Sequence, residues 1–263
     1  MYNHNIYTVI MVRCSNIITR IGSKQNDIKF FKQYLPLDVK TVVEPFAGSF
    51  AVIKNFYVDF NKYNFHINDD DETLYYLYHN PQELIDMKLK LSKLYIEEYK
   101  SKEYDAANKF KNVIQCIEMH DHLKMWVLKN MFIRGSLFKP ISSDNFNPTE
   151  INILKNALIT KLNYTEIFDL YRDDPNAFLF LDFPYLYSDN STYDAQCKDT
   201  DMTQIIVDIL EYFKVCRCKV MLVINKLYIL SYLFKDYIKG EYAKTYPISK
   251  KKSIHLVICN YDQ

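Results

Sequence analysis

Residues 182–185 (Asp-Phe-Pro-Tyr) directly follow an apolar, strand-like run that ends at Leu181. This combination is suited to holding a flat heterocycle that carries an exocyclic amine. The Asp182 carboxylate could accept one hydrogen bond from the amine, and backbone carbonyls held in a proline-stiffened turn could accept the other. The Tyr185 ring could stack on the heterocycle. The tetrapeptide therefore predicts a binding site for an amine-bearing base at the end of a strand.

A second loop, residues 44–50 (Glu-Pro-Phe-Ala-Gly-Ser-Phe), also follows an apolar strand-like run and is typical of a cofactor site. Gly48 permits a tight turn and a close backbone approach, and the helix expected after it presents free N–H groups. Asp69 follows the next predicted strand at roughly the 20-residue offset at which an acid meets a ribose hydroxyl. These residues indicate a nucleoside cofactor; the alternative is an ordinary strand-to-helix turn followed by an exposed acid. Ser49 and Phe50 replace the glycines of a dinucleotide fingerprint, which disfavours a nicotinamide enzyme.

Strands and helices alternate along the chain, which predicts an α/β fold. We expect strands at 40–44, 63–67, 177–181, 219–224, 242–248 and 254–260, and helices at 27–36, 50–58, 71–80, 81–104, 105–131, 200–214 and 226–238. The last two strands flank residues 249–253, which are typical of a hairpin tip. Residues 85–150 are mainly helical and interrupt the α/β pattern, so we expect an inserted subdomain between residues 1–84 and 151–263. Both loops should then lie at the carboxyl ends of parallel strands, where open sheets bind ligands.

The composition is that of an ordinary globular protein, with 263 residues of which 49% are hydrophobic and 25% charged. The formal net charge of +1 gives no overall attraction to nucleic acid, so phosphate contacts would need local clusters of Lys and Arg. Six cysteines without paired C-x-x-C spacing indicate free thiols in a reducing compartment. The start lacks the pattern of a secretory signal, and no apolar run approaches the roughly 18 residues of a membrane span. The sequence therefore predicts a soluble, intracellular protein without membrane association.

Four segments, in this order, resemble the Dam-type adenine-N6 DNA methyltransferases, and the resemblance covers nearly the whole chain. Residues 20–24 (Arg-Ile-Gly-Ser-Lys) resemble the family's Gly-Gly-Lys motif, and residues 44–48 are similar to its Glu-Pro-Phe cofactor loop. Residues 68–74 (Asn-Asp-Asp-Asp-Glu-Thr-Leu) resemble its Asn-Asp-x-Asn-x-x-Leu segment, and residues 182–185 match Asp-Pro-Pro-Tyr with one substitution. The resemblance implies a Rossmann-like methyltransferase fold, S-adenosylmethionine as cofactor, and a target-recognition role for the insertion at 85–150.

The resemblance also implies a role for each matching residue. Lys24 would contact the methionine carboxylate of the cofactor, Gly48 would let that group approach the backbone, and Asp69 would accept hydrogen bonds from the ribose. Asp182 and the carbonyl of Phe183 would hold the N6 amine of an adenine flipped out of the duplex. The implied catalytic residues are Asp182, Phe183, Pro184 and Tyr185, and the implied cofactor-binding residues are Gly22, Lys24, Glu44, Pro45, Phe46, Ala47, Gly48, Ser49, Asp69 and Asp182. A metal has no role in this scheme.

The implied partner is double-stranded DNA that contains an adenine site. Arg134, Lys139, Lys250, Lys251 and Lys252 are the candidates for phosphate contacts, although lysines at a hairpin tip also serve solubility. The sequence specifies neither the recognition site nor a cognate nuclease, because base readout depends on how loop side chains dock. Both a monomer and a dimer agree with it.

Three departures from the family pattern bear on activity. Phe183 replaces the first proline of the tetrapeptide, so the turn loses a fixed φ. Phe50 occupies a usually small position, where it would either crowd the cofactor or pack beneath it. Residues 132–138 (Phe-Ile-Arg-Gly-Ser-Leu-Phe) only loosely resemble the family's Phe-Asn-Gly-x-x-Arg segment. Two alternatives to the DNA enzyme therefore stay open: a catalytically inactive DNA-binding or scaffold protein with the same fold, and an adenine methyltransferase that acts on RNA.

Overall fold

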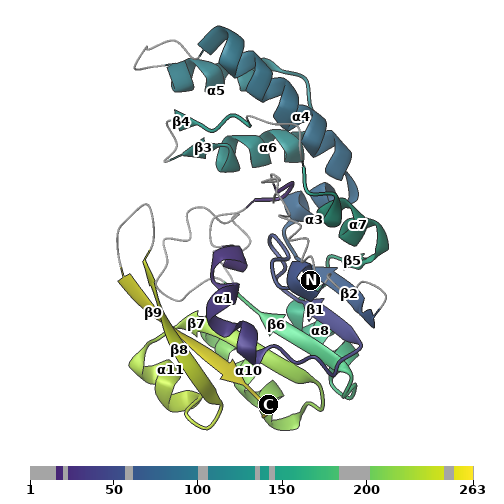
Figure 1. Ribbon diagram of the computed structural model, residues 1–263, viewed down its shortest axis with the longest axis vertical. Helices are drawn as coiled ribbons and strands as arrows, with labels where there is room; N and C mark the ends of the chain where they lie inside the picture. The colour runs from purple at the N-terminus through teal and green to yellow at the C-terminus, as the bar shows by residue number, and fades with distance from the viewer. Residues whose placement is uncertain are drawn as a thin grey trace, which may run out of the picture.

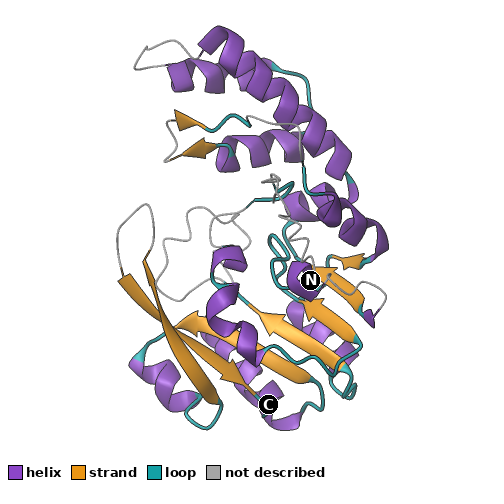
Figure 2. Cartoon of the chain, in the orientation of Figure 1, coloured by secondary structure: helices purple, strands orange, loops and turns teal. Residues whose placement is uncertain are grey.

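The computed structural model describes residues 16–19, 23–56, 62–99, 106–133, 137–141, 146–183, 202–245 and 252–262. A single large sheet forms one half of the protein, and a mainly helical lobe built from α4, α5 and α6 stands over one end of it (Figures 1 and 2). None of the helices in the described ranges is both long and apolar enough to cross a membrane.

The large sheet has seven strands and is mostly parallel. Its strands, in spatial order, are β5 (Leu158–Thr160), β2 (Asn64–Asn68), β1 (Thr41–Glu44), β6 (Ala177–Leu181), β7 (Lys219–Asn225), β9 (Lys252–Cys259) and β8 (Ile238–Thr245). The first five are parallel, β9 is antiparallel to β7, and β8 is antiparallel to β9. The predicted Rossmann-like sheet with a carboxyl-terminal antiparallel pair is confirmed. A second sheet of two short strands, β3 (Phe132–Ile133) and β4 (Leu137–Phe138), lies in the helical lobe.

Helices cover both faces of the large sheet and make up most of the lobe (Figure 2). The α-helices, in chain order, are α1 (Ile28–Phe31), α2 (Ile53–Phe56), α3 (Glu72–His79), α4 (Pro81–Leu94), α5 (Ala106–Cys116), α6 (Asp121–Asn130), α7 (Pro148–Asn156), α8 (Tyr164–Tyr171), α10 (Met202–Val215) and α11 (Tyr228–Leu233). Helical segments of other types are η1 (Lys24–Asn26), η2 (Lys32–Tyr34) and η4 (Tyr95–Tyr99).

The central strand β6 shows why the sheet is sandwiched between helices. Alternate side chains of a strand point to opposite faces. Phe178 and Phe180 pack on one face in a cluster that includes residues of α1, α2 and the helical lobe. Leu179 and Leu181 pack on the other face with α8 and α10. A strand buried on both sides reads as a continuous apolar run, which is why residues 177–181 were predictable from sequence.

Several predicted elements differ from the observed ones. Strand β5 and helices α7 and α8 were not predicted. The predicted helix 226–238 is wrong in length, because α11 ends at Leu233 and the apolar residues after it, Phe234 and Tyr237, pack in a turn against Phe213 of α10. Strand β8 consequently begins earlier than predicted, and β9 also begins two residues earlier than predicted. The predicted insertion ends at residue 150, which lies in the first turn of α7; the domain division itself stays a prediction.

Candidate active site

The carboxyl ends of β1 and β6 lie side by side in the middle of the sheet. Strand β1 pairs in parallel with β2 on one side and with β6 on the other. The chain leaves β1 toward β2 and later returns to β6 on the opposite side, so the strand order reverses at this point. Open α/β sheets bind their ligands at such a reversal. The loop at residues 44–50 and the segment that begins at Asp182 both start there.

The loop after β1 is shaped by a buried carboxylate and a left-handed glycine. Glu44 is buried, and its Oε1 accepts a hydrogen bond from the backbone N–H of Ile53 at 2.7 Å, which fastens the start of α2 under the loop. Burial raises the pKa of Glu44 to about 8. Gly48 has φ 54°, a conformation that glycine adopts without strain. Glu44 therefore orders the loop from below, whereas Gly48 shapes its turn.

Phe50 packs beneath the loop. Its side chain is fully buried, its ring meets Tyr78 edge-on with centroids 5.9 Å apart, and the ammonium of Lys54 lies 4.6 Å from its centroid. Its backbone φ is 41°, which is uncommon for a residue with a side chain, and its N–H donates to the carbonyl of Ala47 at 2.6 Å. Of the two arrangements that the sequence left open for this ring, the structure has the one in which it belongs to the core.

Asp69 lies directly against the Gly48 turn. Its Oδ2 accepts a hydrogen bond from the Gly48 N–H at 2.8 Å, and its Oδ1 accepts one from the Asp71 N–H at 3.2 Å. Asp71 in turn caps α3 by accepting from the N–H groups of Thr73 and Leu74. The structure thus brings together the predicted cofactor loop and the predicted ribose-binding acid, which belong to different strands.

Asn68 is a structural centre of the site that the sequence prediction did not include among the site residues. Its Nδ2 donates to the carbonyls of Pro45 (2.9 Å) and Leu162 (3.0 Å). Its Oδ1 accepts from the Leu162 N–H (2.8 Å) and from the Thr160 hydroxyl (2.7 Å). One buried amide therefore ties the loop after β1 to the end of β5. The signals for it in the sequence are its place immediately before Asp69 and its match to the first asparagine of the segment at residues 68–74.

Lys24 and Asp182 form an ion pair although 158 residues separate them. Lys24 is buried, and the Asp182 side chain is 21% exposed. Burial raises the pKa of Asp182, and the positive charge of Lys24 opposes this rise. The two residues that were assigned to cofactor and amine thus share one location. Beside them, Asp27 pairs with Lys244 at 2.6 Å and adds a second, partly buried charge pair that the sequence did not reveal.

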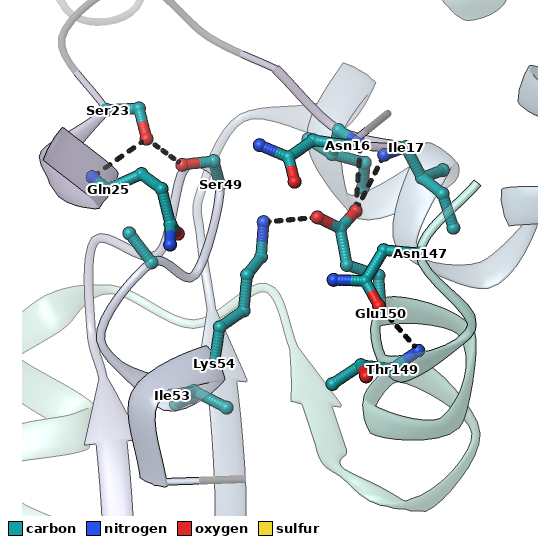
Figure 3. Close-up of polar contacts among 12 residues, drawn as sticks. Asn16, Ile17, Ser23, Gln25, Ser49, Ile53, Lys54, Asn147, Thr149 and Glu150 are labelled. Atoms are coloured by element: carbon teal, nitrogen blue, oxygen red, sulfur yellow. Dashed lines mark hydrogen bonds and ion pairs between the residues drawn. The ribbon is translucent and has the colours of Figure 1, made fainter. Parts of the chain in front are cut away.

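The segment that carries Lys24 also contacts the loop after β1 directly. The Ser49 hydroxyl donates to the Ser23 hydroxyl at 2.7 Å, and the Ser23 oxygen caps η1 through the Gln25 N–H (Figure 3). This hydrogen bond fixes the turn before Lys24 against the loop that contains Gly48. The Lys24–Asp182 pair, the Ser23–Ser49 hydrogen bond and the Gly48–Asp69 hydrogen bond therefore involve neighbouring residues of the same two segments at the switch point of the sheet.

Phe183 is held by aromatic packing. Its side chain is buried, and its ring lies 5.9 Å from that of Phe46, which itself contacts Tyr164 at 5.5 Å. Packing of this kind restricts the backbone after Asp182 in a position where the resembling family has a proline. Phe46 is thus tied to Phe183 through its ring.

Some predicted site residues lie outside the described ranges. These are Gly22, Pro184, Tyr185, Arg134, Lys250 and Lys251. Lys139 and Lys252 are described and exposed, and their contacts with DNA stay predictions. Among the described residues, no group of three or more His, Cys, Asp or Glu side chains is arranged to hold a metal ion.

Known proteins resemble this chain over most of its length. The model of the D12 class N6 adenine-specific DNA methyltransferases matches residues 21–254, a span that contains Lys24, the loop after β1, Asp69 and Asp182. The chain is also 30% identical, over 283 residues, to the Type II methyltransferase M.CviBI of Paramecium bursaria Chlorella virus NC1A; the match covers 93% of this chain and 99% of that protein. The chain therefore belongs to the D12 class N6 adenine-specific DNA methyltransferases, and its reaction is the methylation of adenine N6 in DNA.

Proposed function

We propose that the methyl donor is S-adenosylmethionine and that the substrate is an adenine flipped out of double-stranded DNA. The observation that carries the proposal is the meeting of Lys24, the Gly48 turn, Asp69 and Asp182 at the switch point of the sheet. The site offers a cation, a loop with a close backbone approach and a carboxylate on the side of β2. The cation fits the carboxylate of the donor, the loop fits its amino-acid part, and the carboxylate of Asp69 fits its ribose.

The residues proposed to hold the donor come from three segments. Lys24 would contact its carboxylate, the backbone of residues 45–49 would line its amino-acid part, and Asp69 would accept hydrogen bonds from its ribose. Glu44 would act from below by keeping the loop on α2. When bound, S-adenosylmethionine supplies an electrophilic methyl group on a sulfonium centre. Gly22 completes the proposed set by its place in the motif of Lys24.

The proposed task of Asp182 is to orient the adenine amine. The lone pair of this nitrogen is delocalised into the ring, which makes the amine a poor nucleophile. Asp182 and the carbonyl of Phe183 would accept hydrogen bonds from its two N–H groups and turn the hydrogens out of the ring plane, which exposes the lone pair. Tyr185 would stack on the base, and Pro184 would stiffen the turn between them. The packing of Phe183 against Phe46 supports this scheme, because it holds the acceptor carbonyl in place.

The target-recognition role of residues 85–150 is likewise a proposal. It is supported by the separate helical lobe that stands over the carboxyl ends of the strands (Figure 1). Arg134, Lys139, Lys250, Lys251 and Lys252 are proposed to contact DNA phosphates. Since M.CviBI is described as a Type II methyltransferase, we propose the same class for this chain. A DNA substrate also places the proposed activity inside a cell.

Transfer of label tests this proposal. The protein is incubated with methyl-labelled S-adenosylmethionine and with unmethylated duplex DNA, single-stranded DNA or RNA of the same sequence. The proposal predicts label in the duplex, at the N6 position of adenine, and much less in RNA. Label that enters RNA in preference to DNA would contradict the proposed substrate. Absence of specific binding of S-adenosylmethionine to the folded protein in a calorimeter would contradict the proposed donor.

A further inference from the structure

Glu150 is a fully buried carboxylate that has no part in the proposed chemistry. Its Oε2 accepts hydrogen bonds from the backbone N–H groups of Ile17 (2.7 Å) and Ile18 (3.3 Å), and its Oε1 pairs with the ammonium of Lys54 at 2.6 Å. Figure 3 shows Lys54 rising from α2 toward this carboxylate, which projects from α7. One side chain thus joins α7, α2 and the segment that precedes Lys24.

A repeated sequence pattern shows that this use of Glu150 is special. Residues 147–150 (Asn-Pro-Thr-Glu) and 163–166 (Asn-Tyr-Thr-Glu) begin α7 and α8 with the same spacing of Asn, Thr and Glu. In α8 the Glu166 side chain accepts from the N–H of Asn163 and closes a capping box. In α7 both oxygens of Glu150 bind groups from elsewhere in the chain. A residue type that ordinarily serves its own helix therefore makes a long-range contact here.

The carbonyl groups of the segment that Glu150 binds, residues 16–18, also accept hydrogen bonds. The ammonium of the buried Lys88, on α4, donates to the carbonyls of Ile17 (2.5 Å) and Asn16 (3.1 Å). Burial lowers the pKa of Lys88 to about 8, while the negative charge of Glu150 opposes that fall. Residues 16–18 are therefore held by the carboxylate of Glu150 at their N–H groups and by the ammonium of Lys88 at their carbonyls.

Lys54 links this anchor to the cofactor loop. It lies one residue after Ile53, whose N–H is held by Glu44, and its ammonium stands over the ring of Phe50. The other end of the Lys24 segment meets the same loop through the hydrogen bond between Ser23 and Ser49. The stretch that leads to Lys24 is thus tied to residues 44–54 twice, once on each side of residues 19–22 (Figure 3).

We propose that Glu150 is a positioning residue. Through Lys54 it holds the stretch that leads to Lys24 against the cofactor loop, residues 44–49, and thereby sets the affinity for the methyl donor. This inference rests on the proposed function, because it takes Lys24 and residues 44–49 as parts of the donor site. A buried ion pair adds little net stability compared with an apolar pair of similar size, so its value here lies in geometry. The affinity for the donor should accordingly depend on the pair even where stability does not.

The sharpest test is the neutral double variant Glu150→Gln with Lys54→Met. It removes the ion pair without leaving a buried charge alone, and glutamine keeps an oxygen that can accept from Ile17 and Ile18. The binding of S-adenosylhomocysteine is measured by calorimetry, together with the thermal midpoint and the emission of Trp126. This is the one tryptophan of the sequence, and its ring lies 4.9 Å from the ammonium of Lys88, so it reports whether residues 16–18 stay docked.

We expect the double variant to keep the emission of Trp126 and a midpoint above that of Glu150→Gln alone, yet to bind S-adenosylhomocysteine roughly 3- to 30-fold more weakly. Glu166→Gln is the matched control, because it changes the same residue type at the same helix position, and its affinity should equal that of the wild type. Lys54→Arg retains the cation and should retain most of the affinity, whereas Lys54→Met should not. This last comparison decides the matter if the double variant fails to fold.

Two different failures can be told apart. Equal affinity of the wild type and the folded double variant, or of Lys54→Arg and Lys54→Met, would overturn the positioning role and leave the proposed function intact. Failure of the wild type itself to bind S-adenosylhomocysteine would overturn the proposed donor, and the positioning role with it.

Discussion

The carboxylate of Asp182 lies in a partly buried position beside the ammonium of Lys24. A carboxylate accepts hydrogen bonds from an amine more strongly when it is ionised than when it is protonated. Burial works against ionisation, and Lys24 works for it. The pairing of these two residues therefore has a consequence for the pH dependence of the reaction, besides the proposed contact between Lys24 and the methyl donor.

Replacing Lys24 by methionine should move the acidic limb of the kcat profile to higher pH. Burial raises the pKa of Asp182, and the ammonium of Lys24 lowers it. Without this ammonium the pKa should rise further, so that the ionised form appears only at higher pH. The measurement is kcat between about pH 5 and 9 at saturating donor and DNA. Lys161→Met, which removes a half-exposed partner of Glu72, is the control. An acidic limb that stays where it is in the wild type would show that Lys24 does not govern Asp182.

At the scale of single residues, sequence reasoning could name candidate residues for the site but not the contacts between them. Lys24 and Asp182 were both assigned to the cofactor, and Asp182 also to the adenine amine, but their ion pair was not foreseen because the two residues lie 158 positions apart in the sequence. Glu44 was predicted among the cofactor-binding residues, and the structure places its carboxylate on the Ile53 N–H. Asn68 stood in a recognised segment but was given no role, and Glu150 was missed, because both act through tertiary partners.

At the scale of elements, Asn68 decides how the loop after β1 is held. Its side chain satisfies backbone groups of Pro45 and Leu162 that lie on either side of β2. Strand β5 adds the Thr160 hydroxyl to the same amide. The loop therefore depends on a hydrogen-bond network that spans three neighbouring strands.

Asn68→Ala should lower the free energy of unfolding by about 1–3 kcal/mol, because it leaves buried backbone groups without partners. The binding of the methyl donor should weaken at the same time, since Pro45 belongs to the proposed cofactor loop. Urea unfolding and calorimetry with S-adenosylhomocysteine measure the two effects. Asn156→Ala, which removes an exposed amide on α7, provides the comparison. A loss of stability no greater than that of Asn156→Ala would refute the role assigned to Asn68.

The elements that were predicted correctly are those whose local pattern is complete. Strand β6 is an unbroken apolar run with helices on both faces. Strand β5 has three residues and an exposed Leu158, so its membership in the sheet comes from pairing with β2 and not from its own pattern. The tip between β8 and β9 falls outside the described residues, but the register of the two strands confirms the predicted hairpin.

At the scale of the whole molecule, buried titratable groups make stability depend on pH. His66, on β2, is buried and contacts the hydroxyls of Tyr171 and Thr160 at 2.8 and 2.7 Å. Burial lowers its pKa from 6.5 to about 4. The unfolded chain therefore binds a proton at His66 between these values when the folded protein does not, and this contribution to stability is lost as the pH falls from 6.5 toward 4. Glu44, with a pKa raised to about 8, acts in the opposite sense.

A comparison of variants isolates the contribution of His66, because the effect of Glu44 is common to both proteins. We expect wild-type protein to lose more unfolding free energy than His66→Gln when the pH falls from about 7 to 5. Urea unfolding at both pH values gives the difference, and His79→Gln, at an exposed position of α3, serves as the control. A pH dependence that is the same in the wild type and His66→Gln would contradict the assignment.

The fold brings two distant parts of the sequence together in the site. Lys24 precedes the residues of the helical lobe in the sequence and Asp182 follows them, and the sheet places the two side chains together beside the loop after β1. We propose that adenine is methylated at this location and that Asp182 accepts a hydrogen bond from its N6 amine. A variant that changes the charge of Asp182 and almost nothing of its shape tests this role.

The most direct test is Asp182→Asn, assayed for N6-methyladenine in duplex DNA after incubation with labelled S-adenosylmethionine. Asp169→Asn, at an exposed position of α8, is the matched control. We predict that the wild type and Asp169→Asn form N6-methyladenine, and that Asp182→Asn stays folded and binds S-adenosylhomocysteine but loses at least about 100-fold in kcat. Wild-type rates in a folded Asp182→Asn variant would contradict the account.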